Sequence, residues 1–342
     1  MIASCPVFPD DAVFNQRIDD TTRFPAHGMS TTWVGNIGST RALHADWGQS
    51  EDQQAWTTYY GIPYNVVNGS TLTWPGVSFQ VTDPRAGNGD GVPDESDCGI
   101  AQSGGGFSLE RGCDRFAPSQ LRFPFPDDSV IKAEAGVCND AQQCGDRHVL
   151  VLEANSCRLW ESYFSYKVTG QWYAYSTAAW NLNSNAMRPD TWTSGDAAGL
   201  PILPLLVRAD EATANDIRHA FRVTFRDSVL ANTYVWPARH KAGGATTNGI
   251  PFGSRLRLSN SFVIPSSWTT QAQAVARAMQ RYGLIVSDIG SDLYVQGEPS
   301  AQWSSSTITQ LQSLHMQNFE FVNMQSVTGD SRFDGNSYRA NW

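Results

Sequence analysis

The sequence predicts a mainly β protein, a β-sandwich or jelly roll with long disulfide-pinned loops and one or two short helices near the C-terminus. Three observations favour this class. Only 17% of the 342 residues are charged, whereas Trp, Tyr, Phe and Gly are abundant, a composition typical of strands and ordered loops. Several segments alternate with period two, and the six cysteines form an even set. A chain of this length can bury a sizeable core as one large β-rich domain or as two smaller ones, and since nothing in the sequence forces a split, we expect a single large domain over residues 1–342.

The cysteines indicate an oxidising compartment. They form no CxxC pair and no Cys/His zinc pattern, so disulfides are favoured. Short separations pair Cys98 with Cys113 and Cys138 with Cys144, which leaves Cys5 for Cys157. We therefore expect an extracellular or periplasmic protein that begins at a processed start, because MIASCPVF lacks the basic and apolar regions of a signal peptide. In the alternative, residues 2–5 are a lipoprotein cleavage box and Cys5 carries a lipid anchor.

Charge and hydropathy exclude two partner classes. The formal net charge is −9, and Lys occurs only at Lys132, Lys167 and Lys241. Nucleic acid is disfavoured, because binding to a phosphate backbone needs a basic surface. The chain contains no apolar run of about 18 residues, so we expect no transmembrane segment.

The first third of the chain predicts one short helical turn and several strands. His44 and Asp46 are two residues apart on an extended segment, so they share a face and suit a shared metal ion or a proton relay. The alternative is a turn with a capping Asp. An Asn-Gly pair at Asn68 and Gly69 lies between β-type runs in residues 59–82, and this pattern predicts a hairpin.

Residues 83–145 are rich in Gly, Pro and Cys, and we expect them to form a loop insertion. The segment NGDGVPDESDCG is similar to calcium loops of thrombospondin type 3 repeats and dockerins, since hard cations need many oxygen ligands from a flexible loop. The complete EF-hand pattern is absent, and an acidic loop without metal is the alternative. The candidate calcium ligands are Asn88, Asp90, Asp94 and Asp97, and no organic cofactor is expected.

Residues 146–180 carry the strongest β pattern in the chain. Val149 and Val151 alternate with Leu150 and Leu152, and the following runs predict a meander inside a sandwich. Glu161 lies in one of these apolar strands, where a carboxylate is either paired or functional. Pairing with an Arg is the favoured alternative.

The segment from residue 188 to 240 interleaves ionisable and apolar residues. Asp196 lies in a Gly- and Pro-punctuated loop, a usual location for binding groups, although a capping role is the alternative. Residues 217–227 alternate as a strand, with His219 on the apolar face as a hydrogen-bonded core residue. Arg side chains on its other face either meet carboxylates of a neighbouring strand or line a groove for an anion, and Arg255 and Arg257 would extend this Arg face if their strand is adjacent.

YVWPARH places an indole, a Pro turn and two basic groups at a strand end. Trp with Arg and His is common in sugar sites, because apolar sugar faces stack on aromatic rings; a buried Trp with surface charges is the alternative. The candidate substrate-binding residues are Arg239, Trp236, His44 and Arg208, and the candidate catalytic residues are Asp196, Glu161, Asp46 and His240.

The C-terminal third predicts the one long helix. Apolar residues recur with helical spacing over residues 270–282, and Gly283 follows as a C-terminal stop. Residues 284–296 read as strand, turn and strand, residues 307–314 as a second short helix and residues 319–322 as a strand. Residues 328–342 are expected to form a polar arm.

Several of these segments together resemble a group of secreted bacterial proteins to which no activity is assigned. The similar segments are FPDD, LHADWG, YGIPYNVV, DRHVLVLE, TSGDAAGLPILPLLVRADE, YVWPARH and RYGLIVSDIGSDLYVQG. The resemblance covers most of the chain and leaves the Cys98 to Cys144 region as an insertion. It implies a secreted, single β-rich domain and does not define a chemistry.

The candidate residues are compatible with two functions. The first is a secreted carbohydrate-active enzyme, a glycoside hydrolase with paired carboxylates, or a lyase in which Arg neutralises a uronate and His or Tyr removes a proton. The second is a non-catalytic extracellular protein, a glycan-binding module or a self-assembling surface-layer or filament subunit. Serine-hydrolase, zinc-protease, P-loop and dinucleotide motifs are absent from the sequence.

Overall fold

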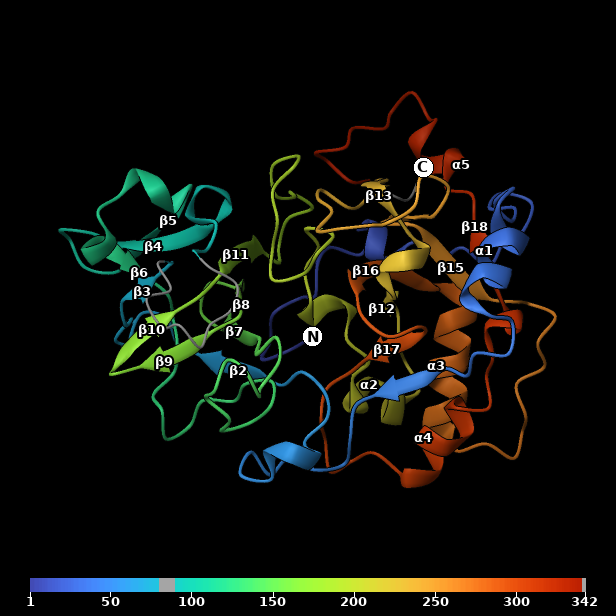
Figure 1. The fold of residues 1–342 in the computed structure, drawn as a ribbon, viewed down its shortest axis with the longest axis horizontal. Helices are drawn as coiled ribbons and strands as arrows, with labels where there is room; N and C mark the ends of the chain where they lie inside the picture. The colour runs from blue at the N-terminus through green and yellow to red at the C-terminus, as the bar shows by residue number, and fades with distance from the viewer. Residues whose placement is uncertain (80–89, 340–342) are drawn as a thin grey trace.

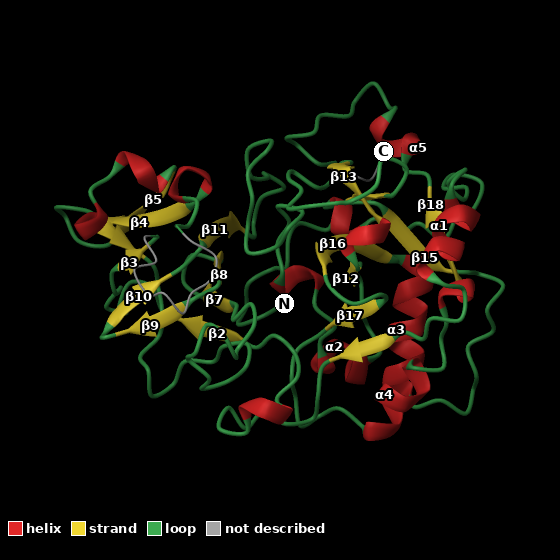
Figure 2. Ribbon diagram, in the orientation of Figure 1, coloured by secondary structure: helices red, strands yellow, loops and turns green. Residues whose placement is uncertain are grey.

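The chain folds into two lobes that lie side by side (Figure 1). The computed structural model describes residues 1–79 and 90–339. Strand residues exceed helical residues, 25% against 19%, so the predicted mainly β class is confirmed (Figure 2). We call the part that holds strands β2 to β11 the small lobe, and the part that holds the other strands and the helices the large lobe.

The large lobe is organised around one mixed six-stranded sheet. Its strands follow the order β1-β17-β12-β16-β15-β18, and the pairs β1·β17 and β12·β16 are parallel whereas the other neighbours are antiparallel. A two-stranded sheet, β13 (Leu230–Tyr234) with β14 (Ile250–Phe252), lies beside it. The strands of the large sheet are β1 (His44–Asp46), β12 (Phe221–Phe225), β15 (Arg255–Leu258), β16 (Leu284–Ile289), β17 (Tyr294–Gln296) and β18 (Phe319–Val322).

The α-helices of the described residues belong to the large lobe, whereas the small lobe carries short 3-10 helices at Pro93–Glu95, Cys113–Arg115 and Pro118–Gln120 (Figure 2). The longest is α3, which confirms the helix predicted over residues 270–282, and its N-terminus is capped by the Thr269 side chain, which accepts a hydrogen bond from the Ala272 backbone N–H. The second predicted C-terminal helix is α4. The helices are α1 (Ser30–Ile37), α2 (Ala209–Ala214), α3 (Thr270–Arg281), α4 (Ser305–Leu311) and α5 (Gln325–Thr328).

The small lobe contains three sheets. The four-stranded sheet has the order β11-β8-β7-β2, and two three-stranded sheets have the orders β3-β10-β9 and β5-β4-β6. Its strands are β2 (Tyr64–Val67), β3 (Val77–Ser78), β4 (Asp97–Ala101), β5 (Phe107–Arg111), β6 (Leu121–Arg122), β7 (Val149–Glu153), β8 (Arg158–Tyr163), β9 (Tyr166–Val168), β10 (Gln171–Tyr173) and β11 (Ser176–Asn181).

The four-stranded sheet lies between two hydrophobic cores. Leu150 and Leu152 of β7 pack into the core that extends through the large lobe, whereas Val149 and Val151 pack into a second core inside the small lobe, around Trp160. The alternation that predicted β7 therefore assigns its two faces correctly. One face of this sheet joins the two lobes, and the other closes the small lobe.

The hairpin predicted at Asn68 and Gly69 is wrong. β2 pairs parallel with β7 and β3 pairs with β10, so the two expected partners belong to different sheets. The Asn68 carbonyl accepts hydrogen bonds from the Thr71 and Leu72 backbone N–H groups, which turn the chain away. The strand, turn and strand predicted over residues 284–296 are present as β16 and β17, and β12 lies between these two strands in the sheet.

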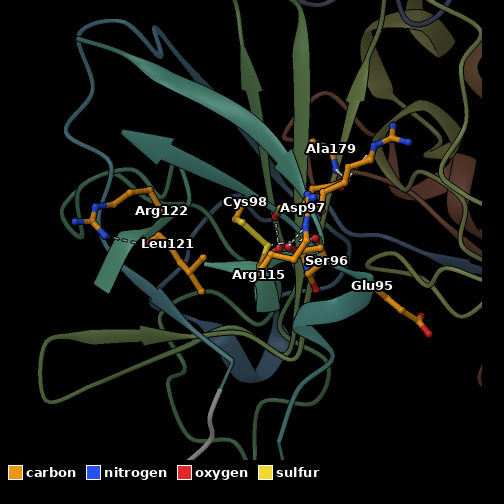
Figure 3. The surroundings of a disulfide bond; sticks show 12 residues. Glu95, Ser96, Asp97, Cys98, Arg115, Leu121, Arg122 and Ala179 are labelled. Carbon is orange, nitrogen blue, oxygen red and sulfur yellow. Dashed lines mark hydrogen bonds and ion pairs between the residues drawn. A yellow bond between two sulfur atoms is a disulfide. The ribbon is translucent and has the colours of Figure 1, made fainter. Parts of the chain in front are cut away.

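All three predicted disulfides are present, and the described residues contain no free cysteine. Cys5 pairs with Cys157 in the turn between β7 and β8. The alternative with a lipid anchor at Cys5 is therefore corrected, because a sulfur in a disulfide cannot carry a thioether. Figure 3 shows the surroundings of Cys98, where Asp97 and Ala179 lie close together.

Two segments expected as irregular contain ordered structure. Within residues 90–145, β4 and β5 pair antiparallel and β6 joins them. Near the C-terminus, Tyr338 is 1% exposed and packs against Phe14 and Trp236. No helix in the described ranges combines the length and apolar character needed to cross a bilayer.

Candidate active site at the junction of the lobes

The Arg222 guanidinium is the centre of a buried polar cluster. On β12, Phe221, Val223 and Phe225 pack into the main core, so the alternation of the strand turns Arg222 to the other face. There its Nη2 donates hydrogen bonds to Asp196 Oδ2 at 3.0 Å and to Asp288 Oδ2 at 3.1 Å. Its Nη1 donates to the Gln296 side-chain oxygen. The arginine is 0% exposed, so these partners replace its hydration.

The small lobe contributes an ion pair to the same junction. His148, directly before β7, shares a 2.6 Å hydrogen bond between its Nδ1 and Glu134 Oε2, and its Nε2 lies 2.6 Å from the Gly195 carbonyl oxygen. The Glu134 backbone N–H donates to the His148 carbonyl, and the His148 backbone N–H donates back to Glu134 Oε2. This ring of contacts fixes the Glu134 side chain, which keeps 23% exposure.

The large lobe contributes Asp46 at the rim of the cluster. Asp46 is paired with Gln296 across β1 and β17. His44 and Asp46 share one face, as predicted, with His44 Nε2 3.8 Å from Asp46 Oδ1. The His44 ring stacks on Tyr294 at a centroid distance of 4.0 Å. The Asp46 side chain remains 25% exposed, so it is accessible to a ligand.

The electrostatics of the junction separate the two accessible carboxyl groups. Burial, and next the charge of Glu134, raises the pKa of Asp46. Burial opposes ionisation of Glu134 too, but the adjacent His148 outweighs it and lowers the pKa of Glu134. Although burial disfavours its charge, Glu134 raises the pKa of His148 to about 9. The junction therefore holds one carboxyl whose pKa is raised and one whose pKa is lowered, and pKa values moved apart in this way are typical of groups that divide acid and base roles.

Two of the predicted catalytic residues are buried at the junction, Asp196 and Glu161. Asp196 is 2% exposed, and its Oδ1 accepts a hydrogen bond from the Ala198 backbone N–H at 2.8 Å. Glu161 is 0% exposed, and it accepts hydrogen bonds from the backbone N–H groups of Ile202 and Leu203. Burial raises the pKa of Glu161 to about 7. Both carboxyls are hydrogen bonded inside the protein and support the residues around the site. They are too buried to contact a ligand.

The remaining predicted residues occupy three different places. His240 lies beside the Asp196 loop, with its Nδ1 2.9 Å from the Ala197 carbonyl oxygen. Arg239 donates to the Arg188 carbonyl at 3.1 Å and belongs to the packing of the C-terminal segment, as does Trp236 through its edge contact with Phe333. Arg208 pairs with Glu211. The fold brings four of the predicted residues around Arg222 or His148, namely Asp46, His44, Asp196 and Glu161.

The predicted Arg face is occupied by internal partners. Arg218 pairs with Asp216 and Arg226 pairs with Asp292, in addition to the contacts of Arg222. Arg255 donates to the carbonyls of Val13, Gln16 and Tyr282, and Arg257 pairs with Glu320. Their strand β15 is separated from β12 by β16, so the condition for a continuous Arg face is not met. His219 is a hydrogen-bonded core residue, as predicted.

The predicted calcium ligands are dispersed. Asn88 lies outside the described residues, and Asp90 and Asp94 are exposed. Asp97 is buried, where its Oδ2 accepts a hydrogen bond from the Ala179 backbone N–H at 2.8 Å and pairs with Arg188. In the part of the chain that the structure describes, no three His, Cys, Asp or Glu side chains are placed to hold a metal ion. Calcium binding stays a prediction.

Sequence reasoning missed four members of the cluster as site residues, Glu134, His148, Arg222 and Asp288. Arg222 carried a usable signal, because it is an ionisable residue in a strand flanked by large apolar residues. Asp288 follows an apolar strand. Glu134 carried no signal, since AEAG is an ordinary loop sequence.

Comparisons with known proteins gave no match among protein-family models, curated proteins or solved structures. The junction is a buried polar cluster between the two lobes, in which Arg222 contacts Asp196 and Asp288 and His148 contacts Glu134.

Proposed function

We propose that this protein is a secreted carbohydrate-active hydrolase in which Asp46 is the general acid and Glu134 the general base. The observation that carries the proposal is the unequal environment of these two accessible carboxyls, which raises the pKa of Asp46 and lowers the pKa of Glu134. Glycoside hydrolysis needs such a pair. The three disulfides support secretion, because they persist in oxidising compartments.

The proposed reaction is a single displacement. The Asp46 carboxyl donates its proton to the glycosidic oxygen as the bond from that oxygen to the anomeric carbon breaks. A water molecule forms the new bond to the anomeric carbon, and Glu134 takes a proton from that water. Glu134 Oε2 is held by His148, and among the described residues its Oε1 takes part in no hydrogen bond, so Oε1 is the oxygen proposed to accept the proton.

The arginine contacts favour hydrolysis over the uronate lyase. A lyase needs a guanidinium that can neutralise the carboxylate of its substrate, but Arg222 is fully buried between Asp196 and Asp288. The accessible groups at the junction include the carboxyls of Asp46 and Glu134 beside the His44 ring. Repulsion between like charges then disfavours anionic glycans, so the proposed substrates are neutral or cationic polysaccharides.

The test is a depolymerisation screen on neutral, amino and anionic polysaccharides, with release of reducing ends as the measurement. The wild-type protein is expected to cleave a neutral or an amino polysaccharide. Asp46→Asn and Glu134→Gln are each expected to lower kcat/KM by roughly a hundredfold to ten-thousandfold, which is the usual contribution of a general acid or base.

Asp330→Asn is the matched control, because Asp330 is a surface carboxylate that pairs with Arg332 in the same turn. It should leave kcat/KM unchanged. Absence of reducing-end release on the whole panel would overturn the proposal, and so would full activity of either site variant. Binding of a glycan without cleavage would favour the glycan-binding module, and self-assembly without binding would favour the structural protein.

A further inference from the structure

A second feature of the lobe junction is a cavity of about 610 Å³, a volume within the usual range of ligand sites. It lies between β2 of the small lobe and the segment after β17 in the large lobe. Its walls include Tyr59, Tyr64, Leu72 and the proline rings of Pro63 and Pro299. These flat apolar surfaces suit the CH faces of sugar rings.

The charged groups that line this cavity are mostly acidic. They comprise four carboxyl side chains and one ammonium group, namely Glu51, Asp127, Asp210, Glu298 and Lys132. Asp127 is held ionised by hydrogen bonds from the backbone N–H and hydroxyl of Ser129, which lower its pKa. A cavity with this excess of negative charge attracts cations and repels anions.

Glu298 is the least exposed of these carboxyls. Its Oε1 accepts a hydrogen bond from the Ala209 backbone N–H at 2.9 Å, whereas Oε2 has no hydrogen-bond partner among the described residues. Burial raises the pKa of Glu298 to about 7. A partly buried carboxyl with one unused oxygen beside a cavity favours a ligand that brings a positive charge to that oxygen.

The cavity adjoins the proposed acid–base pair along two segments. Lys132 lines the cavity and Glu134 follows two residues later; in the large lobe, Gln296 contacts Asp46 and Glu298 follows two residues later. Two residues of chain span at most about 7 Å. A sugar chain that reaches the pair could therefore place a neighbouring sugar unit in the cavity.

We propose that this cavity is a subsite for an amine-bearing sugar unit of the polysaccharide, with its ammonium group on Glu298 Oε2 and its ring against Tyr64. The proposal rests on the proposed function, because it treats the cavity as part of one glycan-binding surface. It narrows the substrate class from neutral or cationic polysaccharides to those that contain free amino sugars.

The experiment measures binding alone, by titration calorimetry at about pH 7, near the pKa of Glu298, with β-1,4-linked glucosamine oligomers, their N-acetylated counterparts and oligomers of a uronic acid. Asp46→Asn protein is used beside the wild type, so that cleavage does not interfere. Glucosamine oligomers are expected to bind at least about tenfold more tightly than the N-acetylated ones. Glu298→Gln should weaken glucosamine binding by roughly tenfold or more, which is typical for loss of a charged hydrogen bond.

Asp210→Asn is a second variant at the exposed rim of the cavity, where a folding defect is not expected, and it should weaken binding less. Glu110→Gln on β5 is the matched control, since Glu110 does not line the cavity, and it should bind like the wild type. Equal binding of amine and N-acetyl oligomers, or tighter binding of the uronic acid, would overturn the subsite. Selective amine binding that depends on Glu298, with no cleavage by the wild type, would support the cavity and reject the hydrolase.

Discussion

At the residue scale, function depends on how buried ionisable groups share their charges. Around Arg222, Asp196 and Asp288 compete for one guanidinium, while Glu134 is paired with His148. A buried charge is retained only where it is paired and hydrogen bonded. Among the described residues, Asp46 has no Arg or Lys in direct contact. No adjacent Arg or Lys therefore offsets the burial that raises its pKa.

The His148–Glu134 pair should make stability depend on pH in both directions. The folded pKa of His148 is raised to about 9, so its contribution is complete below the unfolded value of about 6.5 and is lost as pH rises through 9. The folded pKa of Glu134 is lowered, so its contribution is present above about 4.5 and is lost as pH falls. The pair should stabilise the fold most between about pH 4.5 and 6.5.

His148→Gln tests this prediction, because Gln can still donate a hydrogen bond to the Gly195 carbonyl but cannot carry the charge. We expect a loss in free energy of unfolding on the order of 3 kcal/mol near pH 6, measured by urea unfolding across pH. The difference from wild type should shrink towards pH 9 and above. A difference that does not change with pH would show that the pair does not act through its charge.

At the element scale, the sequence predicted two features reliably. These were the alternation of apolar and polar residues along strands and the residue that ends a helix. The helix α3 ends shortly before Gly283, as predicted. Gly283 has a φ of +73°, and a Cβ at this position would lie 2.3 Å from the Leu256 carbonyl oxygen. Only glycine adopts this conformation at that close approach without strain. Strand partners were less predictable, because β2 and β3 carry the local pattern of a hairpin but pair with β7 and β10.

Gly283→Ala should lower the free energy of unfolding by about 2 kcal/mol or more, because it combines a left-handed backbone with a clash against the main chain. Thermal unfolding measures the change. Gly35→Ala is the control, since Gly35 lies inside α1 and no neighbouring atom would lie within 4 Å of the added Cβ. This substitution should be neutral or should stabilise the protein by up to about 1 kcal/mol. Equal effects of the two substitutions would contradict this account.

At the scale of the whole molecule, the lobes are held by one shared core and by a long-range disulfide. Leu150, Leu152 and Leu159 of the small lobe pack in the same core as Phe221 and Val223 of the large lobe. Cys5 and Cys157 are separated by 152 residues, whereas Cys98 and Cys113 are separated by 15. In the chain-entropy model the longer loop gives the larger stabilisation.

Replacing both Cys5 and Cys157 by Ala should therefore lower the free energy of unfolding by about 5 kcal/mol, against about 3 kcal/mol for the Cys98 and Cys113 pair. The measurement is denaturant unfolding of the two double variants beside the wild type. Cys5, Cys98 and Cys113 are all 0% exposed, whereas Cys157 is partly buried. A larger loss in the Cys98 and Cys113 variant would contradict the chain-entropy account.

The sequence by itself indicated the mainly β class, the two short-range disulfides, the faces of β7 and β12, and the limits of α3, because each follows from local spacing; the Cys5–Cys157 pair followed only as the remainder of the six cysteines. Local spacing also placed His44 and Asp46 on one face. Only the tertiary structure decided that Glu134 and His148 from one lobe meet Asp46 and Arg222 from the other. That meeting depends on long-range strand pairing and on the packing of the lobes, and a pattern of neighbouring residues does not encode which distant carboxyl remains accessible.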